Sequence, residues 1–142
     1  MKPILVLCLM ATITLFSFQS KAADIFGGEP DSTIETDVDG AQIFESNDRI
    51  LVMLDGSSIT SMAQIHTILA KALHLPQYYG KNLDALYDVL TDSKVIKKNW
   101  DITIYCGNYL RQNIGDTNVD SLLDVLNDAQ DQNHYNTVMY WQ

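Results

Sequence analysis

Aspartate residues recur at helical spacing in two clusters of this 142-residue chain. The first cluster comprises Asp84, Asp88 and Asp92, and the second comprises Asp120, Asp124, Asp128 and Asp131. Residues four positions apart lie on one face of a helix, where each pair of like charges costs about 0.2–0.5 kcal/mol. The stability of the fold therefore does not explain why the chain has helix faces that are lined with aspartate. They are typical either of a solvated outer surface or of a surface that binds cationic groups on a partner.

The segment before the first cluster combines aromatic residues with glycine. It reads Leu75-Pro76-Gln77-Tyr78-Tyr79-Gly80-Lys81-Asn82. Aromatic side chains beside carboxylates are typical of the few residues that dominate the energy of a protein–protein interface. We expect at least one of Tyr78 and Tyr79 to belong to the core instead. Asn82 can cap a helix that carries the first aspartate cluster.

An enzyme would need these residue types in a different arrangement. Its best candidates are Asp84 with Asp88 as an acid–base pair, or His66, His74 and His134 as metal ligands. Catalytic carboxylates usually come from separate elements that face a cleft, whereas these two share one predicted helix face. The histidines lack the spacing of a metal site. We therefore expect no catalytic residues, no metal and no cofactor.

The apolar pattern from residue 50 onward predicts strands that alternate with helices. A continuous apolar run indicates a buried strand at residues 50–54, and residues 100–106 and 137–141 are predicted to be the second and third strands. Ser61 with Gln64 forms a capping box for a helix that continues towards Pro76. Helical spacing also predicts helices after Asn82 and over residues 119–129, with a short helical or irregular segment at 108–113. This order predicts an α/β fold, a small three-stranded parallel sheet flanked by helices, over residues 50–142.

The first 49 residues divide into two parts. Residues 1–22 have the pattern of a secretory signal peptide, since Lys2 precedes an apolar stretch that is too short to span a bilayer comfortably. Small residues at Ser20 and Ala22 predict cleavage after Ala22, with Ala23 as the neighbouring option. Residues 23–49 form an acidic N-terminal extension that we expect to be loosely ordered. A short strand at residues 42–44 stays open, because its alternation is weak. We expect the cleaved protein to be periplasmic or secreted.

The charge of the chain restricts its partners. It has 18 acidic residues against 9 Lys and Arg, for a net charge of −9. Removing residues 1–22 takes away two lysines and no acid, so the net charge becomes −11. Such a charge disfavours direct binding to nucleic acid or to an anionic membrane. It attracts basic proteins and steers them from a distance.

Residues 75–88 closely resemble the signature of barstar-type ribonuclease inhibitors. They read Leu-Pro-Gln-Tyr-Tyr-Gly-Lys-Asn-Leu-Asp-Ala-Leu-Tyr-Asp, and a weaker resemblance extends from about residue 50 to residue 141. The resemblance implies the same three-stranded parallel sheet. With the signal peptide, it implies an exported, monomeric inhibitor that plugs the active site of a small basic ribonuclease in a 1:1 complex. The alternative is an immunity or binding module for another basic exported protein.

The resemblance implies charged contacts from three carboxylates. Asp88 would occupy a phosphate-binding position, because a carboxylate accepts paired hydrogen bonds from Arg as a phosphate does and cannot be cleaved. Asp84 would pair with a second cationic group, and Asp128 would add an acid from the last helix. Lys81 stands where the family commonly has an acid, and Gln132 where a further acid can contribute. These departures indicate a different partner surface or a lower affinity.

The resemblance also implies uncharged contacts from the same motif. Tyr78 and Tyr87 would pack on the rim of the ribonuclease, with Tyr87 standing where Trp is usual. Gly80, Asn82 and Leu83 would fill contacts at the level of the backbone.

Overall fold

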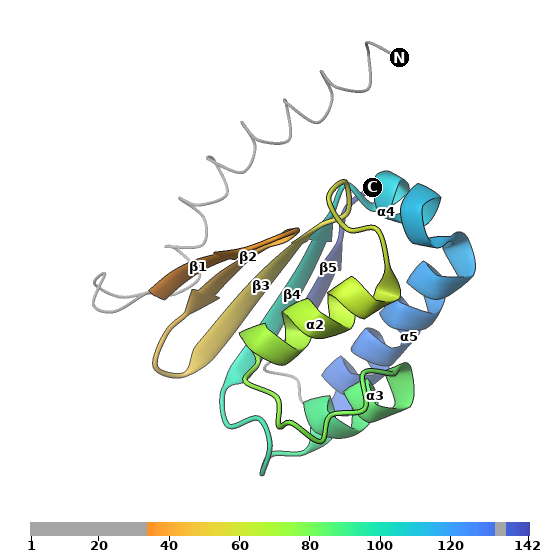
Figure 1. Ribbon diagram of the computed structural model, residues 1–142. Helices are drawn as coiled ribbons and strands as arrows, with labels where there is room; N and C mark the ends of the chain where they lie inside the picture. Colours follow the sequence, from red (N-terminus) through yellow and green to blue (C-terminus); the bar gives the residue numbers. More distant parts are fainter. Residues whose placement is uncertain (1–33, 133–135) are drawn as a thin grey trace. The chain divides into compact units, whose positions relative to one another are not determined.

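The computed structural model describes residues 34–132 and 136–142, which form one mixed sheet with helices packed on it (Figure 1). The sheet has five strands in the order β1-β2-β3-β4-β5. The strands are β1 (Ile34–Val38), β2 (Ala41–Glu45), β3 (Arg49–Asp55), β4 (Asn99–Tyr105) and β5 (Thr137–Tyr140). The helices are α2 (Met62–Ala72), α3 (Leu83–Thr91), α4 (Gly107–Ile114) and α5 (Asp116–Gln132). The α/β class is confirmed, but the prediction of a three-stranded sheet is wrong.

The three predicted strands are present and parallel. β3 pairs with β4 in the register Val52↔Ile102, and β4 pairs with β5 in the register Ile102↔Val138. Parallel neighbours need crossover connections, which α2 with α3 and α4 with α5 supply. The error in the prediction therefore lies in two additional strands at one edge of the sheet.

The additional strands come from the acidic extension that we expected to be loosely ordered. β1 and β2 form an antiparallel hairpin, in which Val38 pairs with Ala41. β2 then pairs with β3 in the antiparallel register Ile43↔Val52. Ala41 and Ile43 are buried in the core, so the hairpin is stabilised by long-range packing and not by a strong local pattern. Residues 1–33, with the expected signal peptide and cleavage site, lie outside the described residues.

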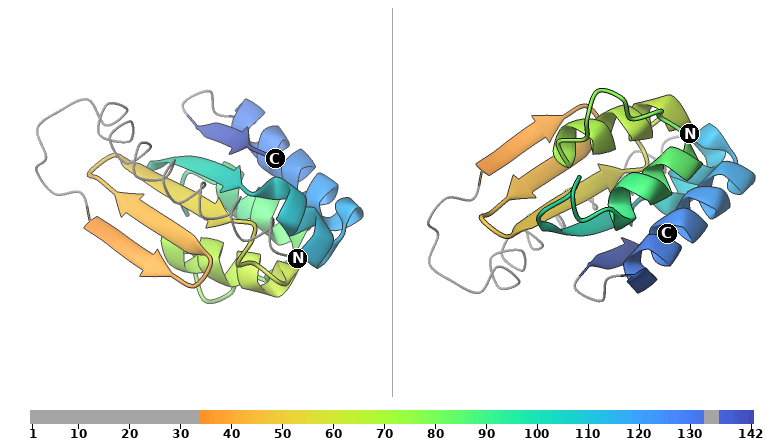
Figure 2. Two further views of the ribbon diagram at one scale, coloured as in Figure 1. Left: turned by 90° about the horizontal axis from the view of Figure 1, so that it is seen from above. Right: turned by 90° about the horizontal axis from the view of Figure 1, so that it is seen from below.

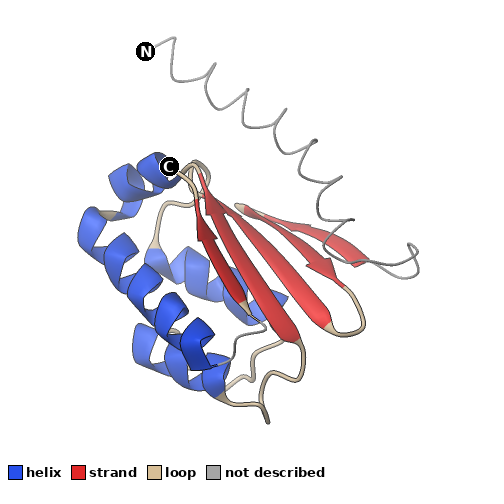
Figure 3. Cartoon of the chain, turned by 180° about the vertical axis from the view of Figure 1, so that it is seen from behind, coloured by secondary structure: helices blue, strands red, loops and turns tan. Residues whose placement is uncertain are grey.

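The hydrophobic core lies between the helices and one face of the sheet, as Figure 3 shows. Val52 of β3 and Ile102 of β4 belong to this core, together with Leu69 of α2, Leu86 of α3 and Leu122 of α5. The two views in Figure 2 show α2 and α3 side by side along the sheet and α5 next to α3. None of the helices in residues 34–132 is long and apolar enough to span a membrane.

The helix boundaries follow from local capping. The Ser61 hydroxyl accepts a hydrogen bond from the Gln64 amide at 3.1 Å, and the Gln64 side chain accepts one from the Thr60 amide at 3.0 Å. The first bond satisfies an amide that the first turn of α2 leaves free, as the capping-box prediction required, whereas the second goes to Thr60, one residue before the N-cap. The helix ends at Ala72, ahead of Pro76. The segment at residues 108–113 is helical and forms most of α4.

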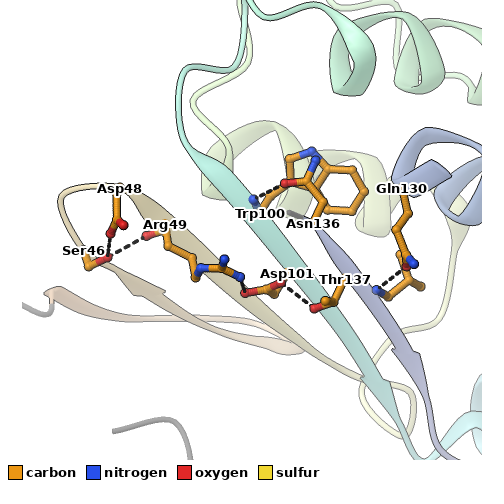
Figure 4. Close-up of polar contacts among 9 residues, drawn as sticks. Ser46, Asp48, Arg49, Trp100, Asp101, Gln130, Asn136 and Thr137 are labelled. Atoms are coloured by element: carbon orange, nitrogen blue, oxygen red, sulfur yellow. Dashed lines mark hydrogen bonds and ion pairs between the residues drawn. The ribbon is translucent and has the colours of Figure 1, made fainter. Parts of the chain in front are cut away.

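Polar side chains connect the parallel strands (Figure 4). Arg49 donates from Nη1 to Asp101 Oδ2 at 2.6 Å, and the Thr137 hydroxyl donates to the other oxygen of the same carboxylate. The Asn136 side chain accepts a hydrogen bond from the Trp100 amide at 2.9 Å. Asp101 is only 4% exposed, so its charge needs these partners. The network joins β3, β4 and β5 and holds the sheet that supports the helices.

Candidate protein-binding site

The loop between α2 and α3 has one tyrosine inside the protein and one outside. The Tyr79 amide donates to the Pro76 carbonyl at 2.9 Å, which closes a turn. Tyr79 is 6% exposed, whereas Tyr78 is 77% exposed. The prediction that at least one of the two belongs to the core is therefore confirmed. Tyr78 is left as a large aromatic surface next to the start of α3.

A buried histidine of α2 holds Tyr79 in place. The Tyr79 hydroxyl lies 2.6 Å from Nδ1 of His66, which is itself 4% exposed. Burial lowers the pKa of His66, and the positive charge of Lys81 acts in the same direction. Burial also raises the pKa of Tyr79 to about 12. Both groups are therefore neutral near pH 7, when His66 Nδ1 can accept the hydrogen of the Tyr79 hydroxyl.

Asn82 caps α3, as its sequence position predicts. Its Oδ1 accepts a hydrogen bond from the Ala85 amide at 2.8 Å, and its Nδ2 donates to the Gly80 carbonyl at 3.3 Å. A Cβ at Gly80 would lie 3.0 Å from that Nδ2, so a larger residue there would crowd the cap. Lys81 has a φ of 49°, in the left-handed region that non-glycine residues seldom adopt. The loop therefore enters α3 through a defined backbone conformation.

α3 has a buried face and an acidic face. Leu86, Val89 and Leu90 are buried, whereas Asp84 and Asp88 are exposed. Within residues 34–132 and 136–142, neither of these two carboxylates forms an ion pair or a side-chain hydrogen bond. The two residues are one helical turn apart, so both project from the same side of the helix. They present two uncompensated negative charges to solvent.

Two of the clustered aspartates have structural roles instead. Asp92 follows the end of α3 and accepts a hydrogen bond from the Lys94 amide at 2.8 Å. Asp120 pairs with Arg111 of α4 at 2.8 Å, and Asp116 lies 3.4 Å from the same guanidinium. The second cluster is therefore less free of positive charge than the sequence indicates, because the base comes from the preceding helix.

The predicted contact residues differ in burial. The exposed ones are Tyr78, Gly80, Asn82, Asp84, Asp88 and Asp128. Leu83 and Tyr87 are half-buried, because both also pack against the core. Asp128 projects from α5, the helix that packs beside α3 (Figure 1), and it has no ion pair among the described residues. The exposed residues thus come from the loop, from α3 and, for Asp128, from the neighbouring helix.

The histidines considered as metal ligands have other contacts. His66 contacts Tyr79, and His74 Nε2 lies 2.9 Å from Glu45 Oε2. His134 lies outside the described residues. In the part of the chain that the structure describes, no group of three His, Cys, Asp or Glu side chains could hold a metal ion.

Residues 50–142, which span β3 to β5 and the helices between them, match the sequence profile of the family described as "Barstar (barnase inhibitor)". The chain belongs to the barstar family. A similar protein is the "Putative ribonuclease inhibitor YrdF" of Bacillus subtilis (strain 168), which is 30% identical over 87 residues. That alignment covers 57% of this chain and 86% of the relative. The barstar-type resemblance of the sequence is thereby confirmed, and the β1–β2 hairpin precedes the matched region.

Two features of this surface were not predicted from the sequence. His66 supports the loop from thirteen residues away, and nothing in the helical pattern distinguishes it from an ordinary core residue. Arg111 pairs with Asp120 across the junction of α4 and α5, where Gly115 ends α4. The Asn82 cap and the aspartate spacing could be predicted because both are local in the sequence.

Proposed function

We propose that this barstar-family protein inhibits a small basic ribonuclease by placing the acidic face of α3 and the preceding loop in the active site of the enzyme. The observation that carries the proposal is the exposure of Asp84 and Asp88, without ion-pair partners among the described residues, on a helix whose other face is buried. Tyr78 offers an exposed aromatic anchor in the adjoining loop. The name of the Bacillus subtilis relative, "Putative ribonuclease inhibitor YrdF", supports the same function.

The chemistry of the two carboxylates fits a site that binds RNA phosphates. An active site of this kind holds Arg, Lys or protonated His at its phosphate positions. Asp88 accepts paired hydrogen bonds from such a cation as a phosphate oxygen pair does, and it offers no bond to cleave. Asp84, about 5–6 Å away along the helix, pairs with a second cation. Asp128 on α5 adds a third negative charge at the edge of the contact.

The proposal includes export and a 1:1 complex. Cleavage after Ala22 places the protein in the periplasm or outside the cell, where it meets a ribonuclease in transit or from a competitor. The mature chain is a monomer that binds one ribonuclease. Its net charge of −11 favours approach by a basic enzyme and explains how a small surface finds its partner quickly.

The test is inhibition of a barnase-like ribonuclease by the mature protein from residue 23 onward. Asp88→Asn removes the charge and keeps the shape of the side chain. The matched control is Asp39→Asn, which makes the same charge change in the exposed β1–β2 turn, with α2 lying between that turn and α3 (Figure 1). Removing one partner of a buried, hydrogen-bonded charge pair costs about 2–5 kcal/mol, so inhibition by Asp88→Asn should weaken at least about 30-fold.

The outcomes separate the function from the site. Strong loss in Asp88→Asn with little change in Asp39→Asn supports both. Equal losses in the two variants would show that net charge alone drives binding and would remove the assigned site. If the unmodified protein leaves the ribonuclease uninhibited, the function is wrong, and another basic exported protein becomes the partner to seek.

A further inference from the structure

We infer that His66, acting through Tyr79, is the positioning residue of the binding loop and thereby sets how tightly the acidic surface binds its partner. The inference rests on the proposed function, but it concerns a residue of α2 that does not touch the partner. His66 is 4% exposed and its ring nitrogen lies 2.6 Å from the Tyr79 hydroxyl. The two rings are 5.9 Å apart between centroids, at an angle of 57°.

The loop has few other anchors. Of its residues 75–82, only Tyr79 is buried, while Leu75 and Pro76 are half-buried and the rest are exposed. The turn from Pro76 to Tyr79 fixes the backbone just before the anchored ring. Tyr78 is the direct neighbour of Tyr79 and is 77% exposed, so anchoring the Tyr79 ring restricts the backbone from which Tyr78 projects. A loose Tyr79 would leave Tyr78 beside an unanchored residue and Gly80 with the Asn82 contact alone.

Neutral His66 accepts the hydrogen of the Tyr79 hydroxyl at Nδ1, whereas protonated His66 can only donate from Nδ1, so protonation reverses the direction of this hydrogen bond. The titratable groups that act on the His66 ring are the Tyr79 hydroxyl, which touches it, and Lys81, whose charge opposes protonation. The residues buried with α2, such as Val52 of β3 and Leu86 of α3, are apolar and do not titrate. Protonation at acid pH also places a positive charge in this apolar setting, which costs free energy. The loop anchor is therefore weakened as the pH falls.

The first measurement uses the free protein, so it does not depend on the identity of the partner. Amide ¹⁵N relaxation of Tyr78 and Gly80 should give order parameters near 0.85 in the wild type and below about 0.6 in Tyr79→Phe, which lacks only the buried hydroxyl. Tyr78→Phe, which removes an exposed hydroxyl from the same loop, should leave these order parameters unchanged. Unchanged loop order in a folded Tyr79→Phe would overturn the inference.

A second variant tests the histidine itself. His66→Gln keeps a hydrogen-bond acceptor but cannot be protonated in this range. Wild-type loop order should fall as the pH is lowered below about 6.5 and through the lowered pKa of His66, whereas His66→Gln should keep the same order. A parallel fall in both proteins would show that another group controls the loop and would overturn the role of His66.

Binding supplies the functional readout. Against a barnase-like ribonuclease, Tyr79→Phe should inhibit about three- to tenfold more weakly at pH 7, mainly through faster dissociation. Equal inhibition by Tyr79→Phe and the wild type would contradict the inference even if loop order changed. If the wild type fails to inhibit, the proposed function is wrong, while the relaxation data on the free protein still decide whether His66 positions the loop.

Discussion

Removing the Asn82 cap should destabilise the protein by about 1 kcal/mol, because Asn82→Ala leaves a backbone amide at the start of α3 without its partner. The bond to be lost is the 2.8 Å contact between Asn82 Oδ1 and the Ala85 amide. The same substitution also removes the 3.3 Å contact from Nδ2 to the Gly80 carbonyl. Because Asn82 and its loop are exposed, water can replace part of both interactions, which limits the loss to the usual range of a cap.

The assay is equilibrium unfolding in urea, followed by far-ultraviolet circular dichroism. With an m-value of about 2 kcal/mol per molar urea, a loss of about 1 kcal/mol lowers the midpoint by about 0.5 M. Asn82→Asp is the matched control, since aspartate caps as well as asparagine and its charge complements the helix dipole. Its midpoint should stay within about 0.2 M of the wild type.

The reasoning fails if Asn82→Ala unfolds at the same urea concentration as the wild type. It also fails if Asn82→Asp loses as much stability as Asn82→Ala. The first result would mean that the first turn of α3 does not depend on the cap. The second would mean that the Nδ2 contact to Gly80, which aspartate cannot make, matters more than the bond to Ala85.

Three further predictions concern titration, packing and charge. Burial lowers the folded-state pKa of His66 from its usual 6.5, so the unfolded chain binds more protons between those two values. The stability from this group is fully present above about pH 6.5 and is lost as the pH falls towards the lowered pKa; urea titrations of His66→Gln should lack this loss. Leu86→Ala, at a position that is 0% exposed, should cost about 2–5 kcal/mol, and Leu83→Ala, at a half-buried position, clearly less in the same assay. In stopped-flow measurements, the rate of association with a basic ribonuclease should fall several-fold between about 20 and 150 mM salt while dissociation changes little; an unchanged association rate would contradict steering.

The parts of the fold that local patterns determine could be predicted. Ser61 and Asn82 mark helix starts because each accepts a hydrogen bond from an amide three residues later, and that spacing is visible in the sequence. The hairpin could not be predicted in the same way. Residues such as Asp37 and Asp39 make its strand pattern weak, and its order depends on the pairing of β2 with β3 and on Ile43 in the core.

The candidate site likewise has features that local sequence patterns predict and features that depend on tertiary packing. Exposure of Asp84 and Asp88 follows from helical spacing opposite buried Leu86 and Val89, so the sequence predicts it directly. The contact of His66 with Tyr79 depends on how α2 and the loop pack together. The helical periodicity does not predict this contact, because His66 occupies a core position on the helix whether or not it bonds to Tyr79.

The distribution of ion pairs explains why α3 stays negatively charged in a protein that also has basic residues. Arg49 is occupied by Asp101, Lys98 by Glu45, and Arg111 by Asp120. Each of these bases stabilises the sheet or a helix junction, and its side chain is one-quarter to one-third exposed. These three bases are thus held by structural acids, and the Asp84 and Asp88 carboxylates face solvent without an ion-pair partner among the described residues. A partner with clustered cations meets that surface at full charge, which is the condition that electrostatic steering requires.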